Sequence, residues 1–142
     1  MNTQHPGKPC KAGSIMIVDS SPDYSNTLRH AFEDRGYLTW TCPGPDIASC
    51  ILLAIHPTAV VLDLDLEGVN PFDIMDAWRA LSPSTRIVVE MRVPDAQRLQ
   101  TAMDHGADTY FVKTSPMTPL FQFLEEKRVS EPPPPQPFNE AA

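Results

Sequence analysis

A series of short, continuous apolar runs constrains the fold of this chain more than any other feature of its sequence. The runs are IMIV at 15–18, AVVL at 59–62, IVV at 87–89 and YFV at 110–112. A strand buried on both faces gives an unbroken apolar run, whereas a strand with one face in water alternates apolar and polar residues. The runs therefore predict the inner strands of a parallel sheet.

Segments with the apolar spacing of helices separate these runs. Ser21 and Pro22 are typical of a helix start, and Gly36 is expected to end that first helix. Five strand–helix units of this kind predict an α/β fold, a doubly wound five-stranded parallel sheet of order 2-1-3-4-5 with helices on both faces. The expected strands are 14–19, 37–41, 58–63, 86–91 and 109–113, and the expected helices are 22–35, 45–56, 71–81, 94–105 and 119–127. The residues of the second helix that we expect to face the core are Ile47, Cys50, Ile51 and Ala54.

Length and charge narrow the domain organisation and the class of partner. The 142 residues fit one domain, placed at 14–128 between a flexible N-terminal tail at 1–13 and a proline-rich tail or linker at 129–142. The net charge of -7 disfavours direct nucleic-acid binding, because such a surface repels phosphate backbones. The longest apolar run, at 51–55, is too short to cross a membrane, and no signal peptide is visible. These features predict a cytoplasmic protein whose partner is neither nucleic acid nor a membrane.

Charged side chains stand at the carboxyl ends of the expected strands. Asp19 follows the first strand, Asp63 ends the third and Lys113 ends the fifth. In doubly wound sheets, ligands bind outside these ends where the strand order reverses, here between the first and third strands. Neighbouring carboxylates repel each other unless a proton or a cation relieves the repulsion, and Mg²⁺ prefers such oxygen ligands. The sequence thus predicts a Mg²⁺ site at Asp19 and Asp63, which Lys113 approaches from beyond the fourth strand.

The same segments resemble motifs of the response-regulator receiver domain of two-component signalling. They are IMIVD at 15–19 followed by Pro22, VLD at 61–63, and GADTYFVK at 106–113, which is the most specific. The resemblance extends over about residues 14–127 and implies the flavodoxin-like receiver fold. It implies a signalling module of a phosphorelay, not an enzyme, that receives a phosphoryl group from a histidine kinase or phosphotransfer protein. A downstream protein target and a homodimer through the fourth helix, fifth strand and fifth helix are the further partners expected.

The resemblance also assigns roles to individual residues. Asp63 is the expected phosphoacceptor, Asp19 belongs to the acidic metal pocket, and Lys113 is the partner lysine. The backbone carbonyl of Asp65 is expected to complete the protein ligands of Mg²⁺. Tyr110 matches the aromatic residue that changes rotamer on activation, although half-buried packing on the edge strand would explain it equally well.

Several positions depart from the family pattern. Ser20 stands where receivers carry a second acid that binds the metal, so Mg²⁺ binding is expected to be weakened. Met91 stands where a strand-four Ser or Thr contacts the phosphoryl group, and a thioether makes no useful hydrogen bond there. The other departures are Arg92 in place of a small residue, Thr114 in place of the proline after the lysine, and Glu67 and Pro71 in the loop after the phosphoacceptor.

These departures leave other interpretations open. In the first, the chain is a pseudo-receiver that acts by protein–protein interaction without phosphorylation, with Arg92 either paired with Asp63 or in solvent. The carboxylate of Asp65 is a candidate to compensate in part for Ser20. More remotely, Asp63-Leu-Asp65 resembles the D-x-D nucleophile motif of haloacid-dehalogenase-like phosphatases.

Overall fold

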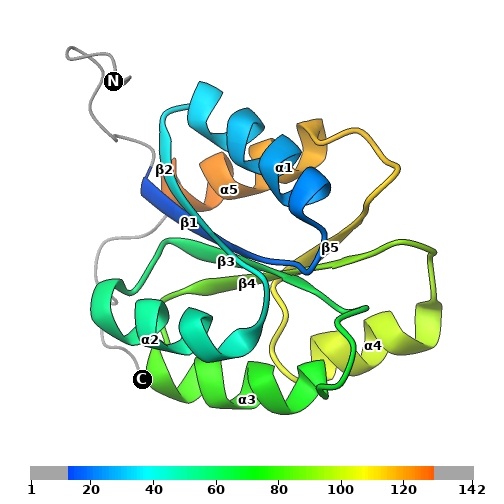
Figure 1. The fold of residues 1–142 in the computed structure, drawn as a ribbon. Helices are drawn as coiled ribbons and strands as arrows, with labels where there is room; N and C mark the ends of the chain where they lie inside the picture. The colour runs from blue at the N-terminus through cyan, green and yellow to red at the C-terminus, as the bar shows by residue number, and fades with distance from the viewer. Residues whose placement is uncertain (1–12, 130–142) are drawn as a thin grey trace, which may run out of the picture.

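The computed structural model describes residues 13–129, in which strands and helices alternate throughout (Figure 1). The strands are β1 (Gly13–Val18), β2 (Tyr37–Cys42), β3 (Ala59–Asp63), β4 (Arg86–Met91) and β5 (Thr109–Val112). The helices are α1 (Pro22–Asp34), α2 (Pro45–Ile55), α3 (Pro71–Leu81), α4 (Ala96–Asp104) and α5 (Thr118–Val129). All neighbouring strands are parallel and their order is β2-β1-β3-β4-β5, which confirms the predicted α/β sheet.

Helices cover both faces of the sheet, with α1 and α5 on one side and α2, α3 and α4 on the other (Figure 1). Successive strand residues point to opposite faces, so each strand contributes to two cores. In β1, Ile15 and Ile17 pack with Leu28 of α1 and its neighbours, whereas Met16 and Val18 pack with the opposite core. This alternation decides on which side of the sheet each charged strand-end residue lies.

Local sequence signals place most of the helix starts. The Ser21 hydroxyl accepts a hydrogen bond from the Tyr24 amide at 3.3 Å, as expected for the cap of α1. The α4 helix begins after Asp95, not at 94, because the Asp95 carboxylate caps the amides of Gln97 and Arg98. The last helix runs to Val129, beyond the expected end at 127.

The prediction for the inner face of α2 was wrong for three of its four residues, since among them only Ile51 packs against the core. Ala48 and Leu52 are the buried residues, Ile51 is partly buried, and Ile47 is 61% exposed. The helix is apolar around most of its circumference, so the spacing alone does not select a face. A tertiary contact is consistent with the observed orientation, because Trp78 Nε1 of α3 donates to Ser49 Oγ at 3.0 Å. The other two predicted residues, Cys50 and Ala54, are exposed as well.

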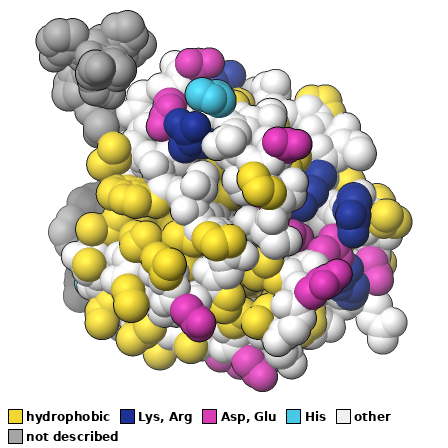
Figure 2. Space-filling view, in the orientation of Figure 1, with side chains coloured by type: hydrophobic (Ala, Val, Ile, Leu, Met, Phe, Trp, Pro, Cys, Tyr) yellow, Lys and Arg dark blue, Asp and Glu magenta, His cyan; other side chains and the backbone are white. Residues whose placement is uncertain are grey.

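This orientation of α2 leaves apolar side chains on the surface. Hydrophobic residues gather over the side where β2 and α2 lie (Figure 2). The large exposed members on these two elements are Leu38, Ile47, Leu53 and Ile55.

The predicted tails lie outside the described residues, apart from Gly13 in β1 and Val129 at the end of α5. Among the helices of residues 13–129, none combines the length and apolar character that crossing a bilayer requires.

Candidate functional site

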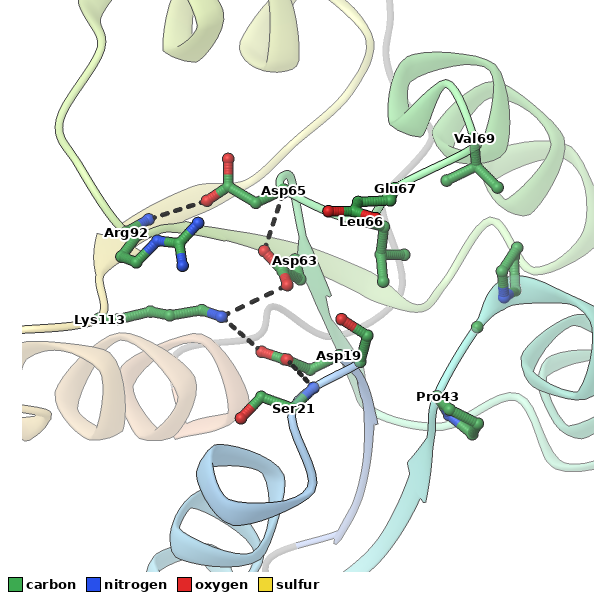
Figure 3. A pocket seen from close by; sticks show the side chains of 13 residues that line it. Asp19, Ser21, Pro43, Asp63, Asp65, Leu66, Glu67, Val69, Arg92 and Lys113 are labelled. Atoms are coloured by element: carbon green, nitrogen blue, oxygen red, sulfur yellow. Dashed lines mark hydrogen bonds and ion pairs between the residues drawn. The ribbon is translucent and has the colours of Figure 1, made fainter.

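Acidic and basic side chains converge at one edge of the sheet, because parallel strands end on the same side (Figure 3). Asp19 follows β1, Asp63 ends β3 and Lys113 follows β5. Asp63 is paired in register with Glu90 of β4. Sequence reasoning placed the first three residues together, and the structure brings them into contact.

The ammonium group of Lys113 lies between the two aspartates. Its Nζ is 2.8 Å from Asp19 Oδ2 and 3.3 Å from Asp63 Oδ2. Both aspartate side chains are almost fully buried, at 1% and 4% exposure. The ring of Tyr24 covers the ammonium from the α1 side, 4.7 Å from Nζ. One partly buried cation therefore neutralises part of the repulsion between Asp19 and Asp63.

A backbone amide fixes the second oxygen of each aspartate. Asp63 Oδ1 accepts a hydrogen bond from the Asp65 amide at 2.8 Å, and Asp19 Oδ1 accepts one from the Ser21 amide at 2.8 Å. Each carboxylate thus has one oxygen held by the chain two residues further on and one oxygen facing Lys113. This arrangement sets the direction of both carboxylates.

Glu90 is a fourth charged group of this cluster, and sequence reasoning missed it. Its side chain is fully buried in β4, and no donor among residues 13–129 makes a hydrogen bond to either carboxylate oxygen. Burial, followed by the neighbouring Asp19, raises the pKa of Glu90 well above its ordinary value. Glu90 therefore holds its proton to a higher pH than an exposed glutamate does. An acid within the run IVVEM was the available signal.

Burial and neighbours shift the other titrations in different directions. Burial, with the negative charge of Asp19, raises the pKa of Asp63 despite the opposing Asp65 amide and Lys113. Burial also opposes ionisation of Asp19, but hydrogen bonds from Glu90, Lys113 and the Ser21 amide together lower its pKa. Burial acts against the charge on Lys113, yet the surrounding carboxylates outweigh it and raise the pKa of the lysine. Asp19 is thus the more acidic of the two aspartates.

The carboxylate of Asp65 does not face the other two. Its Oδ1 is 2.9 Å from Arg98 Nη1, and its Oδ2 accepts from the Arg92 amide at 3.1 Å. Asp65 is therefore bound to α4 and to the loop before it, which argues against the idea that its side chain compensates for Ser20. The expected role of Asp65 as a ligand rests on its backbone carbonyl alone.

The departures from the family pattern lie at different places around the site. Ser20 and Arg92 line the pocket, but among the described residues Arg92 makes no ion pair with Asp63. Met91 is buried in the core between the sheet and α2–α4, away from the pocket. Thr114 is exposed, and Tyr110 is 47% exposed on the edge strand.

The hollow outside the strand ends suits a hard cation with few protein ligands. Its polar lining includes Asp19, Ser20, Asp63, Asp65 and Glu67. In the part of the chain that the structure describes, no three His, Cys, Asp or Glu side chains are arranged to hold a metal ion. The carboxylates of Asp19 and Asp63 are oxygen donors of the kind that Mg²⁺ supplements with water, and the backbone carbonyl of Asp65 is the further donor that the family resemblance implies. The residues present therefore fit Mg²⁺. They supply one charged ligand fewer than a site with two adjacent acids after the first strand would supply.

Comparisons with known proteins agree with this architecture. A family model described as response regulator receiver domain matches residues 15–125. The photosynthetic apparatus regulatory protein RegA of Cereibacter sphaeroides is 30% identical over 123 residues, which are 87% of this chain and 67% of RegA.

Solved structures give the same result for the fold. A CheY-like receiver domain protein of Methanospirillum hungatei has a TM-score of 0.75 at 16% identity, over 83% of this chain and 94% of that one. A response regulator of Burkholderia pseudomallei, solved with a phosphorylated aspartic acid and a calcium ion, has a TM-score of 0.72 at 21% identity. That match covers 83% of this chain and 72% of the other. At these levels of sequence identity, the similarity to the two solved structures concerns the fold alone.

Proposed function

Because the chain belongs to the response regulator receiver domain family, we propose that it accepts a phosphoryl group on Asp63 from a histidine kinase or a phosphotransfer protein. The observation that carries this proposal is the contact of Lys113 with both Asp19 and Asp63 at the carboxyl edge of the sheet. This contact joins residues that are 50 or more positions apart in the sequence. A buried cluster of this kind is unexpected for structure alone, since paired charges inside a protein add little net stability.

The proposed reaction uses one oxygen of Asp63. Its Oδ1 is held by the Asp65 amide, which leaves Oδ2 as the oxygen that attacks phosphorus. The new O–P bond forms while the bond between phosphorus and the donor breaks, and the donor leaves with the electron pair of that bond. Lys113, which faces Oδ2, is the cation available to pair with a phosphoryl oxygen.

Mg²⁺ is the proposed cofactor, held by the carboxylates of Asp19 and Asp63 and the backbone carbonyl of Asp65. When bound, the cation supplies charge neutralisation for the incoming phosphoryl group. Asp19 is suited to this role because its lowered pKa keeps it ionised. Ser20 lines the same hollow without a charge, which is the reason to expect weak binding.

The proposed output is a change on the face formed by α4, β5 and α5, recognised by a downstream protein or a second copy. Exposed apolar side chains on or next to α4 and β5 support this choice, namely Val93, Met103 and Tyr110.

A phosphorylation-independent interaction module is the second candidate. It is favoured by the ion pairs of Lys113, which already neutralise part of the negative charge of the pocket without a metal ion or a phosphoryl group. The phosphatase alternative is weaker, because Asp65 is the second acid of its motif and is bound by Arg98.

Intact mass after incubation with acetyl phosphate and Mg²⁺ tests the proposal. We expect one added phosphoryl group, lost in Asp63→Asn and lost when a chelator removes the cation. A chain that gains no mass, under conditions that label an ordinary receiver domain in parallel, would overturn phosphotransfer in favour of the interaction module.

A further inference from the structure

Arg98, in the first turn of α4, binds the loop that follows Asp63. Its Nη1 is 2.9 Å from Asp65 Oδ1, and its Nη2 donates to the backbone carbonyl of Leu64 at 2.6 Å. The two contacts hold a side chain and a peptide group of the same loop, and they join residues 33 and 34 positions apart in the sequence. The planar guanidinium is suited to such a two-point contact because its donors have a fixed geometry.

This contact is continuous with the proposed phosphoacceptor. Asp63 Oδ1 accepts from the amide of Asp65, and the carboxylate of Asp65 is held by Arg98 and by the Arg92 amide. Each link is a hydrogen bond or ion pair of 3.1 Å or less. The Asp65 residue is thus bound on one side by Asp63 and on the other by α4 and the segment before it.

The usual hydroxyl route from the phosphoryl group to strand four is absent. Met91 has no hydrogen-bonding group suited to the task, and its side chain is buried in the core on the α2–α4 side of the sheet. A change at Asp63 therefore needs another physical connection if it is to reach α4.

We propose that Arg98 is a positioning residue that couples the state of Asp63 to α4 through Asp65. The inference rests on the proposed phosphorylation of Asp63 and adds the path by which it acts. An acyl phosphate leaves Asp63 without its negative charge, so its Oδ1 becomes a weaker acceptor for the Asp65 amide. The Leu64–Asp65 segment then shifts, and Arg98 transmits the shift to the first turn of α4.

Hydrogen exchange of segments 64–70 and 96–104 tests the coupling. The wild type, Arg98→Ala and Arg98→Lys are compared before and after treatment with acetyl phosphate and Mg²⁺, with intact mass recording the labelled fraction. Arg29→Ala is the matched control, because Arg29 makes an exposed pair with Glu33 on α1, at 3.3 Å. A thermal melt of each variant shows that it is folded.

We expect Arg98→Ala to speed exchange of both segments roughly tenfold before labelling, as the loss of charge-assisted hydrogen bonds predicts. Labelling is expected to change hydrogen exchange in α4 of the wild type and of Arg29→Ala. In Arg98→Ala we expect no such change in α4, although its labelled fraction should lie within about twofold of that of the wild type. Arg98→Lys keeps the charge but loses the two-point contact of the planar guanidinium. We expect this variant to retain only part of the response.

The outcomes separate this inference from the proposed function. If the wild type is labelled and α4 responds equally in Arg98→Ala, the coupling is wrong and phosphotransfer stands. If the wild type gains no phosphoryl group, both the coupling and the proposed phosphotransfer are wrong. Intact mass alone shows this outcome.

Discussion

Glu90 is a fully buried acid of the site whose pKa differs from that of an exposed glutamate. The carboxyl group is fully buried beside Asp19, and its pKa is well above the ordinary value because of that burial. The native state therefore keeps a proton on Glu90 at pH values where the unfolded chain, with an ordinary pKa near 4.5, has released it. Since the native state binds more protons, the free energy of unfolding falls as pH rises above about 4.5.

Glu90→Gln is expected to remove this pH dependence while keeping the size of the side chain. The stability of the variant relative to wild type should increase from pH 5 to pH 8, by at most about 1.4 kcal/mol per pH unit. Urea unfolding at each pH, with chelator present, measures it. Asp63, whose contribution has the same sign, is present in both proteins. A constant difference between pH 5 and pH 8 would show that Glu90 is ionised in the native state.

Ser20 is the departure that bears most directly on the cation. It lines the hollow next to Asp19, where a carboxylate would add a charged ligand. Ser20→Asp is therefore expected to tighten Mg²⁺ binding about 10- to 100-fold, the effect of one charge-assisted contact. Titration of Mg²⁺ followed by calorimetry measures the change. Asp23, which lies in the first turn of α1 and does not line that hollow, offers a control, Asp23→Asn, that should leave Mg²⁺ affinity nearly unchanged.

The α2 helix shows how the range of a helix can be predicted correctly while most of its predicted inner face is wrong. Its position was predicted to within one residue, yet its sequence PDIASCILLAI carries apolar residues nearly all round, so tertiary contacts must choose. Leu52 and Leu53 are adjacent, but the first is fully buried and the second is 56% exposed. Leu52→Ala should lower the free energy of unfolding by about 2–5 kcal/mol, whereas Leu53→Ala should change it by less than about 0.5 kcal/mol. Urea unfolding of the two variants measures both values, and similar losses would contradict the observed orientation.

Strand positions were easier to predict than side-chain partners. The apolar runs placed β1, β3 and β4, and parallel topology then placed Asp19, Asp63 and Lys113 together. To predict that Glu90 belongs to the site, one would have needed the register of β3 with β4 and the side of the sheet that Glu90 faces. The contact of Asp65 with Arg98 joins a loop to a helix 33 residues away, and no local pattern encodes it.

The balance of charge at the sheet edge links the stability of the entire fold to the proposed cofactor. Lys113 is the cation that both Asp19 and Asp63 contact, and these carboxylates are almost completely buried. Lys113→Ala leaves them unpaired, so the free energy of unfolding should fall by about 3–5 kcal/mol in the presence of chelator. The exposed pair of Arg29 with Glu33 provides the control, since Arg29→Ala should cost less than about 1 kcal/mol.

Mg²⁺ should recover part of this loss, because a divalent cation bound by the two aspartates replaces the missing ammonium charge. A ligand that binds only the native state stabilises it in proportion to the logarithm of its concentration over the dissociation constant. Urea unfolding over a series of Mg²⁺ concentrations should therefore show a larger gain for Lys113→Ala than for wild type, in which the lysine and the metal compete for the same carboxylates. An equal gain in the two proteins would mean that Mg²⁺ binds away from the Asp19–Asp63 pair, and the proposed ligand set would have to be abandoned.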